Sequence, residues 1–61
     1  MIPKFEIFKG KDRQWYFHLR ARNQKVIAQS EGYKTKRGAQ RGIAAVCTAA
    51  RTAVVVEINS R

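Results

Sequence analysis

The chain is short of the residues from which small proteins build covalent or metal cross-links. It has one cysteine, Cys47, and one histidine, His18, among 61 residues. An intrachain disulfide and a His/Cys zinc cluster are therefore both excluded. A chain of this size rarely gains more than about 3–5 kcal/mol from its own core. We therefore expect a single domain over residues 1–61 that is stabilised by a second copy of itself.

Long apolar runs are missing as well. The valine-rich run of residues 53–56 is far shorter than the roughly 20 residues that span a bilayer, so we expect no membrane segment. The opening residues, MIPKFEIFKG, lack the apolar stretch of a secretory signal peptide. Because a lone thiol suits a reducing compartment, we expect a cytoplasmic protein.

Acidic residues are scarce, and this is the strongest bias in the composition. Four Asp and Glu oppose thirteen Lys and Arg, which gives a formal net charge of +9. Such basic domains are candidates for polyanion binding, although a high net charge also serves solubility. No two acids form an obvious pair for acid–base catalysis, and no nucleotide-binding fingerprint is present. We therefore predict a protein that is not an enzyme and that uses no cofactor or metal.

Two segments near the N-terminus alternate as strands, residues 4–9 and, more strongly, residues 14–22. Placing the apolar members of both on one face pairs Ile7 with Phe17. The loop between them must then contain an odd number of residues. A bulged turn of three or five residues that uses Gly10 meets this condition.

A second turn at residues 23–24 leads into a third predicted strand. With a two-residue loop, Ala21 faces Val26 and Leu19 faces Ala28. Val26 and Ala28 then continue the apolar face of the preceding strand, so we expect them to join the core.

An alanine-rich segment from about residue 36 to residue 50 is predicted to be a helix, with Thr35 as its N-cap. Its apolar residues recur at the helical spacing, which predicts a buried stripe. The members of this stripe are Ala39, Ile43, Val46 and Ala50. Cys47 lies beside the stripe, so we interpret it as a small buried hydrophobic residue and not as a nucleophile.

The last apolar segment, residues 53–58 (AVVVEI), is predicted to be a final strand. Three consecutive valines do not alternate, which is typical of a strand covered on both faces. A domain of this size has little material for that cover. We therefore expect this strand to form the interface of a homodimer, through Ala53, Val54, Val55, Val56 and Ile58.

The order and spacing of several short motifs carry a family resemblance. These are FEIFK, WYFHL, NQKVIA, and SEGY followed by KRGAQRGIAAV. Together they resemble the YegP-like family of small domains. The resemblance implies an α+β fold of order β-β-β-α-β, found as tandem repeats or as a dimer with exchanged C-terminal strands. One unit here implies the dimer, and the family implies no established catalytic residues.

Two departures from the family pattern stand out. The family usually carries Asn-Gly at the second turn, where this chain has Asn23 and Gln24. Its helix often carries acids, which are absent from this arginine-rich helix. The second departure bears on what the protein binds.

Two basic surfaces are candidates for binding DNA or RNA. On the open sheet face, Phe8 opposes Tyr16 among cations, an arrangement typical of some single-strand binders. The alternative is that these aromatics pack in the dimer. The second surface is the outer face of the helix. The candidate residues are Phe8, Tyr16, Arg20 and Arg22 on the sheet, and Lys36, Arg37 and Arg41 on the helix.

Other interpretations remain open at this point. The alternative to nucleic acid is an acidic protein partner, whose encounter the basic surface would steer. A groove at the dimer junction near Tyr33 and His18 is a further hypothesis, for a small-molecule binder or an enzyme. In the derived pairing His18 faces Glu6, which favours a simple cross-strand pair over a ligand contact.

Overall fold

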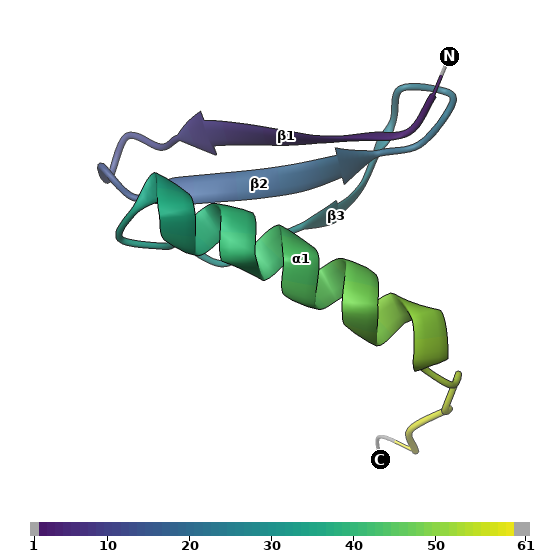
Figure 1. The fold of residues 1–61 in the computed structure, drawn as a ribbon. Coiled ribbons are helices and arrows are strands. Elements are labelled where there is room, and N and C mark those ends of the chain that lie inside the picture. Colours follow the sequence, from purple (N-terminus) through teal and green to yellow (C-terminus); the bar gives the residue numbers. More distant parts are fainter. Residues whose placement is uncertain (1, 60–61) are drawn as a thin grey trace.

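The computed structural model describes residues 2–59 and has a three-stranded antiparallel sheet with one helix across one face (Figure 1). The elements are β1 (Lys4–Lys9), β2 (Trp15–Arg20), β3 (Val26–Gln29) and α1 (Lys36–Thr52). The sheet order is β1-β2-β3, so β2 is central and β3 forms an edge. The predicted α+β class and the order of these four elements are confirmed.

The β1–β2 hairpin has the predicted register. Ile7 pairs with Phe17, and the Gly10 amide donates to the carbonyl of Gln14 across 2.8 Å. The Arg13 amide donates to the Gly10 carbonyl across 3.0 Å, and Arg13 has a φ of 68°. The loop is therefore the bulged three-residue turn, 11–13, which fulfils the odd-number condition.

The β2–β3 turn differs from the prediction. Leu19 pairs with Ala28 as expected, but the Ala21 amide donates to Lys25 across 2.9 Å, so the predicted pair of Ala21 with Val26 is wrong. The loop has three residues, with Gln24 at a φ of 72°. A bulge between the Leu19 and Arg20 pairs restores the register.

Two predicted burial patterns are corrected by the way the helix crosses the sheet. Helix α1 packs on β1 and β2, and it leaves β3 uncovered. All four residues of β3 are therefore exposed, including Val26 and Ala28. Figure 1 also shows α1 diverging from the sheet toward its C-terminal end. Of the predicted stripe, Ala39 is buried and Ile43 half-buried, whereas Val46 and Ala50 are exposed.

The start of α1 follows the predicted capping. The Thr35 hydroxyl accepts from the Gly38 amide across 2.9 Å, which satisfies one of the unpaired amides of the first turn. The helix ends at Thr52, two residues beyond the predicted end at Ala50.

The core is small and aromatic. Only Phe17 and Ala39 are buried apolar residues among those described, with 5% and 0% exposure. The Phe17 ring meets Phe5 edge-on, with centroids 5.7 Å apart, and stacks on Tyr33 at 6.1 Å. This cluster joins β1, β2 and the segment before α1, so it fixes the helix over the first hairpin.

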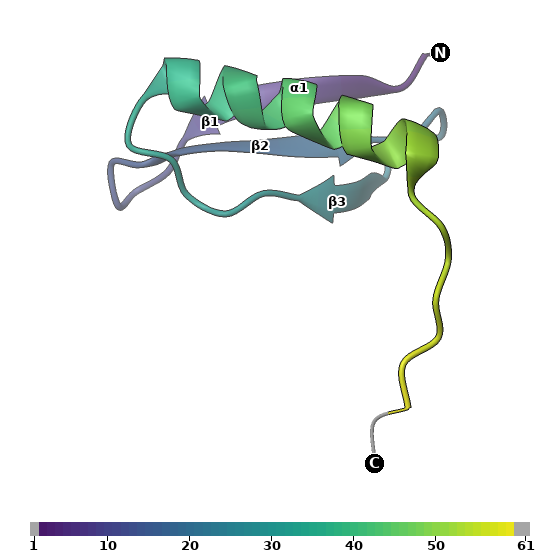
Figure 2. The same cartoon turned by 60° about the horizontal axis from the view of Figure 1, so that its bottom comes forward.

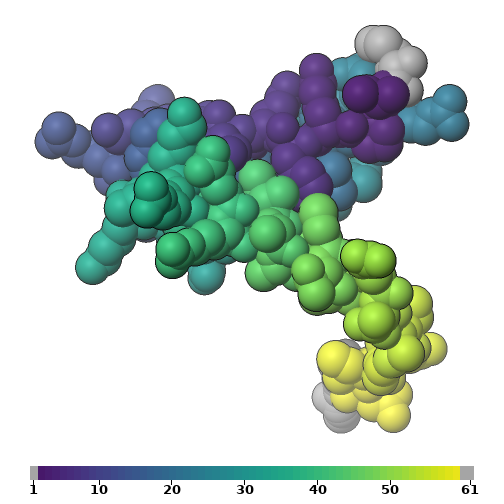
Figure 3. Space-filling view, in the orientation of Figure 1, coloured from purple at the N-terminus to yellow at the C-terminus, as the bar shows by residue number. Residues whose placement is uncertain are grey.

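The C-terminal tail, residues 53–59, leaves the end of α1 and stands off the body (Figure 3, yellow). No strand forms there, which corrects the predicted strand over 53–58 for the isolated chain. Val54, Val55 and Val56 are 79%, 101% and 70% exposed. A strand requires a neighbour for its backbone hydrogen bonds, and the tail has none within the described chain.

Candidate functional site

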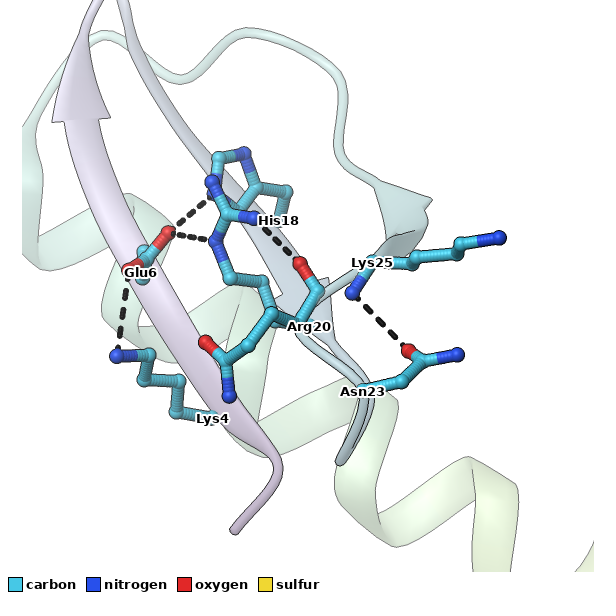
Figure 4. A network of polar contacts seen from close by, with 7 residues as sticks. Lys4, Glu6, His18, Arg20, Asn23 and Lys25 are labelled. Carbon is cyan, nitrogen blue, oxygen red and sulfur yellow. Dashed lines mark hydrogen bonds and ion pairs between the residues drawn. The ribbon is translucent and has the colours of Figure 1, made fainter. Parts of the chain in front are cut away.

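The open sheet face, opposite the helix, is organised around the Glu6 carboxylate (Figure 4). His18 Nε2 lies 2.6 Å and Arg20 Nε 2.7 Å from Oε1 of Glu6. Lys4 Nζ lies 3.8 Å from Oε2. The predicted cross-strand pair of His18 with Glu6 is thus confirmed, within a larger cluster.

These contacts hold the pKa of Glu6 down to about 2, chiefly through the hydrogen bond from Arg20 and then that from His18. Glu6 is therefore a carboxylate throughout the physiological range. Arg20 also donates from Nη1 to the Gln24 carbonyl across 2.6 Å. The guanidinium proposed to contact nucleic acid is consequently engaged on two sides within the chain.

The aromatic pair of the open face forms as predicted. The rings of Phe8 and Tyr16 are stacked with centroids 5.8 Å apart, and Phe8 also lies 5.1 Å from the His18 ring. The Tyr16 hydroxyl donates to the Asp12 carboxylate. This bond raises the pKa of Tyr16 and lowers the pKa of Asp12. The two aromatics are half-buried, and each uses one ring face for the other.

The other residues predicted to contact nucleic acid lie in two places, the β2–β3 turn and helix α1. Arg22 lies in the β2–β3 turn and not on the sheet face, because β2 ends at Arg20. Lys36, Arg37 and Arg41 are exposed on α1, as predicted. Since α1 covers the opposite face of the sheet, these helix cations do not join the Glu6 cluster in one surface.

A third cationic region had not been predicted. Lys9 Nζ and Lys36 Nζ lie 5.8 Å and 5.9 Å from the centroid of the Trp15 ring. Backbone hydrogen bonds of 2.7 Å in both directions tie Trp15 to Tyr33 just before α1. The pairing of Lys9 with Trp15 was derivable from the hairpin register. The approach of Lys36 was not, because it depends on where the helix begins in space.

Several other features of residues 2–59 bear on function. Cys47 is exposed, so its predicted burial is wrong. It lies in the C-terminal half of α1. These residues contain no group of three potential metal ligands and form no pocket. Within the same range, α1 is too short and too polar to cross a bilayer.

Comparison with known proteins places the chain in a family. The family described as a domain of unknown function (DUF1508) matches residues 11–57. The chain belongs to this family. A UPF0339 protein of Treponema denticola is 45% identical over 58 residues, covering 95% of this chain and 100% of that protein. The UPF0339 protein YegP of Yersinia pestis is 45% identical over 45 residues. The predicted YegP-like resemblance is therefore confirmed.

The lengths of these DUF1508 relatives differ. The match to the Yersinia pestis protein covers 74% of this chain but only 40% of that protein. The NMR solution structure of a protein from Haloferax volcanii has a TM-score of 0.85 and 31% identity, covering 93% of this chain and 97% of that one. The family is thus an uncharacterised one with an α+β fold, and its names state no activity.

Proposed function

We propose that the protein is a homodimeric, non-catalytic module of the cytoplasm that binds nucleic acid through its phosphates. One observation supports this most: within residues 2–59, most of the cations have no acidic partner. Residues 2–59 contain twelve Lys and Arg, and two of them, Lys4 and Arg20, form ion pairs, both with Glu6. The other ten cations, twelve minus two, form no ion pair within residues 2–59 and are available to an anionic partner.

The uncovered edge of the sheet supports the homodimer. Strand β3 has a free edge and no helix over it, and an unpaired edge is a template for another strand. The tail, with its three consecutive valines, leaves α1 on the side of β3 and runs away from its own sheet (Figure 2). In a homodimer, the tail of each protomer would pair with the β3 edge of the other protomer.

The relatives provide a further reason for two copies. The chain spans the full length of some relatives and 40% of others. The longer proteins therefore have room for a second unit of this size in one chain. A small domain with two buried apolar residues gains from such a partner the apolar burial that its own length does not provide.

Binding to nucleic acid is tested by fluorescence anisotropy of a labelled oligonucleotide. We expect micromolar or tighter binding at about 50 mM salt that weakens steeply by about 200 mM, because each neutralised phosphate releases counterions. Absence of binding at the lower salt concentration contradicts the proposal.

The alternative partner is an acidic protein, and a competition experiment separates the two. Polyglutamate carries charge without the phosphate groups of a nucleic acid. We expect it to displace the oligonucleotide only at much higher concentration of charge. Equal competition by polyglutamate favours the acidic-protein partner. Light scattering measures the mass, for which we expect two chains.

A further inference from the structure

We infer that the phosphate-binding site of the proposed function lies at the hairpin end of the molecule, around Trp15. The hairpin end is the β1–β2 turn together with the start of α1, which Figure 1 shows at the same end of the fold. This inference rests on the proposed function and gives it a location other than the open sheet face. The cations gathered there are Lys9, Lys11, Arg13, Lys34, Lys36 and Arg37.

These six side chains come from three separate segments and are all exposed. Two acids lie at the same end, Asp12 in the turn and Glu31 before the helix, so the local net charge is six minus two, or +4. The Asp12 carboxylate already accepts from the Gln14 amide and from the Tyr16 hydroxyl. Its hydrogen bonds are therefore directed into the turn and not toward the lysines.

The indole of Trp15 lies beside two of the cations, one from β1 and one from the start of α1. The ammonium groups of Lys9 and Lys36 both lie within 6 Å of its centroid, at 5.8 Å and 5.9 Å. A cation–π contact at an exposed site is weak, so either ammonium group is readily available to a stronger anion. A phosphate bound at either ammonium group would also offset part of the positive charge gathered at this end.

The helix start adds to this preference for an anion. The first turn of α1 contains Lys36 and Arg37 and no acid, although the positive end of a helix dipole disfavours cations. The same dipole and the free amides of the first turn attract a phosphate. In the free protein the helix dipole therefore repels the two cations of the first turn. A bound phosphate offsets this repulsion, because its negative charge attracts both the cations and the dipole.

The open sheet face makes a weaker site by comparison. Its central cations surround Glu6, and the guanidinium of Arg20 is held by two hydrogen bonds. A protein partner generally needs an apolar centre to its interface, whereas the hairpin end has Trp15 surrounded by charge. A phosphate chain needs only the charges, so nucleic acid fits this end better than an acidic protein does.

Trp15 is the only tryptophan in the chain, so its fluorescence reports on this end alone. We expect oligo-dT to change the Trp15 emission as the two ammonium groups turn from the ring toward phosphates. The test variant is Lys9→Gln with Lys36→Gln. The matched control, Lys25→Gln with Arg51→Gln, removes the same charge at the second turn and at the end of α1.

At about 50 mM salt each lost phosphate contact weakens single-strand binding roughly eightfold, since log K falls by about 0.7 per contact for each tenfold rise in salt. We expect the K9Q/K36Q variant to bind about sixtyfold more weakly, with its salt slope reduced by about 1.4. The control is expected to lose less than about threefold, because those cations are distant from the site. Circular dichroism of both variants checks the fold.

The outcomes separate the two proposals. Equal losses in the test and control variants, or an unchanged Trp15 emission when wild-type protein is saturated, overturn the hairpin-end site while nucleic-acid binding stands. Failure of the wild-type protein to bind any oligonucleotide at about 50 mM salt overturns both.

Discussion

Arg20 donates a hydrogen bond from Nε to Oε1 of Glu6 across 2.7 Å, which joins the central strand to β1. The same guanidinium donates to the Gln24 carbonyl, so one side chain connects β1 and the β2–β3 turn. On a sheet with so small a core, this cross-strand network replaces part of the apolar cover that the open face lacks. Arg20 therefore contributes to the stability of the fold, independently of any role in binding.

The network predicts a specific response to acid. The pKa of Glu6 is lowered from 4.5 to about 2, so its carboxylate stabilises the fold fully above pH 4.5. That contribution is lost as the pH falls through about 2. Glu6→Gln removes the titrating group. We expect the gap in unfolding free energy between wild type and this variant to shrink from pH 5 to pH 2, as measured by urea denaturation at fixed protein concentration.

The control for the acid response is Glu31→Gln, since Glu31 is exposed, lies outside the tail and forms no ion pair within residues 2–59. Its gap to wild type should stay near zero across the same range. A Glu6→Gln gap that is as large at pH 2 as at pH 7 contradicts the role given to the Glu6 network.

The second turn contains a residue whose backbone favours glycine. Gln24 has a φ of 72°, and this left-handed conformation costs a residue with a Cβ roughly 1–2 kcal/mol. Gln24→Gly keeps the carbonyl that accepts from Arg20. We expect a gain of about 0.5–1 kcal/mol in unfolding free energy, after the greater freedom of glycine in the unfolded chain is subtracted. Thermal and urea unfolding measure it.

Arg22→Gly is the matched control in the same turn, because Arg22 does not have a positive φ. Glycine there only increases the freedom of the unfolded chain, so we expect no gain or a small loss. If both variants gain equally, relief of left-handed strain is not the cause.

This turn also shows what sequence patterns miss. Alternation and shared faces predicted the β1–β2 register correctly, since Ile7 and Phe17 must both reach the core. The pair of Leu19 with Ala28 was also correct, but only because a bulge offset a longer loop. A one-residue bulge shifts side chains from one sheet face to the other. Where both faces are exposed, as on β3, the pattern of apolar residues in the sequence does not reveal this shift. The exposure of Val26 likewise depends on the path of α1, which is set by the packing of Phe17 and Tyr33.

The candidate site shows the same division. That Phe8 opposes Tyr16 follows from register, and the exposure of Arg37 follows from helical spacing. The partners of those side chains do not follow. Arg20 is held by Glu6, and Trp15 meets a lysine from each of two elements. Such contacts require three-dimensional placement, so the sequence predicted where cations lie but not which of them remain available.

Gly42 permits the close approach of the Tyr33 ring to α1. A Cβ at this position would lie 2.7 Å from Tyr33 Cζ and 3.1 Å from Phe17 Cε2, which is too close without movement of the core. Overpacking of this kind costs about 1–3 kcal/mol, against up to about 1 kcal/mol gained from helix propensity. We expect Gly42→Ala to be destabilised by about 1–2 kcal/mol in urea denaturation.

Gly38→Ala is the matched control on the same helix. Its Cβ would meet Thr35 Oγ1 at 3.2 Å and Tyr33 Cδ2 at 3.5 Å, a much milder approach. We therefore expect the Gly38 variant to be at least about 1 kcal/mol more stable than the Gly42 variant. Tyr33→Phe in the Gly42→Ala background removes the hydroxyl from the crowded point and should recover part of the loss. Equal stability of the two alanine variants contradicts this account of the packing.

The tail makes the sharpest test of the dimer. Val54 and Val56 are 79% and 70% exposed in the isolated chain, so changing both to lysine would have little effect if that chain were the solution form. If the tail pairs with β3 of a second copy, two charges enter an apolar interface. We then expect the light-scattering mass to halve and the melting temperature to fall and lose its dependence on protein concentration. Ile2→Lys is the control, because Ile2 is 76% exposed and lies outside the tail. A wild-type mass of one chain, or a tail variant as stable and as large as the Ile2 control, rules out the exchanged tail as the source of stability.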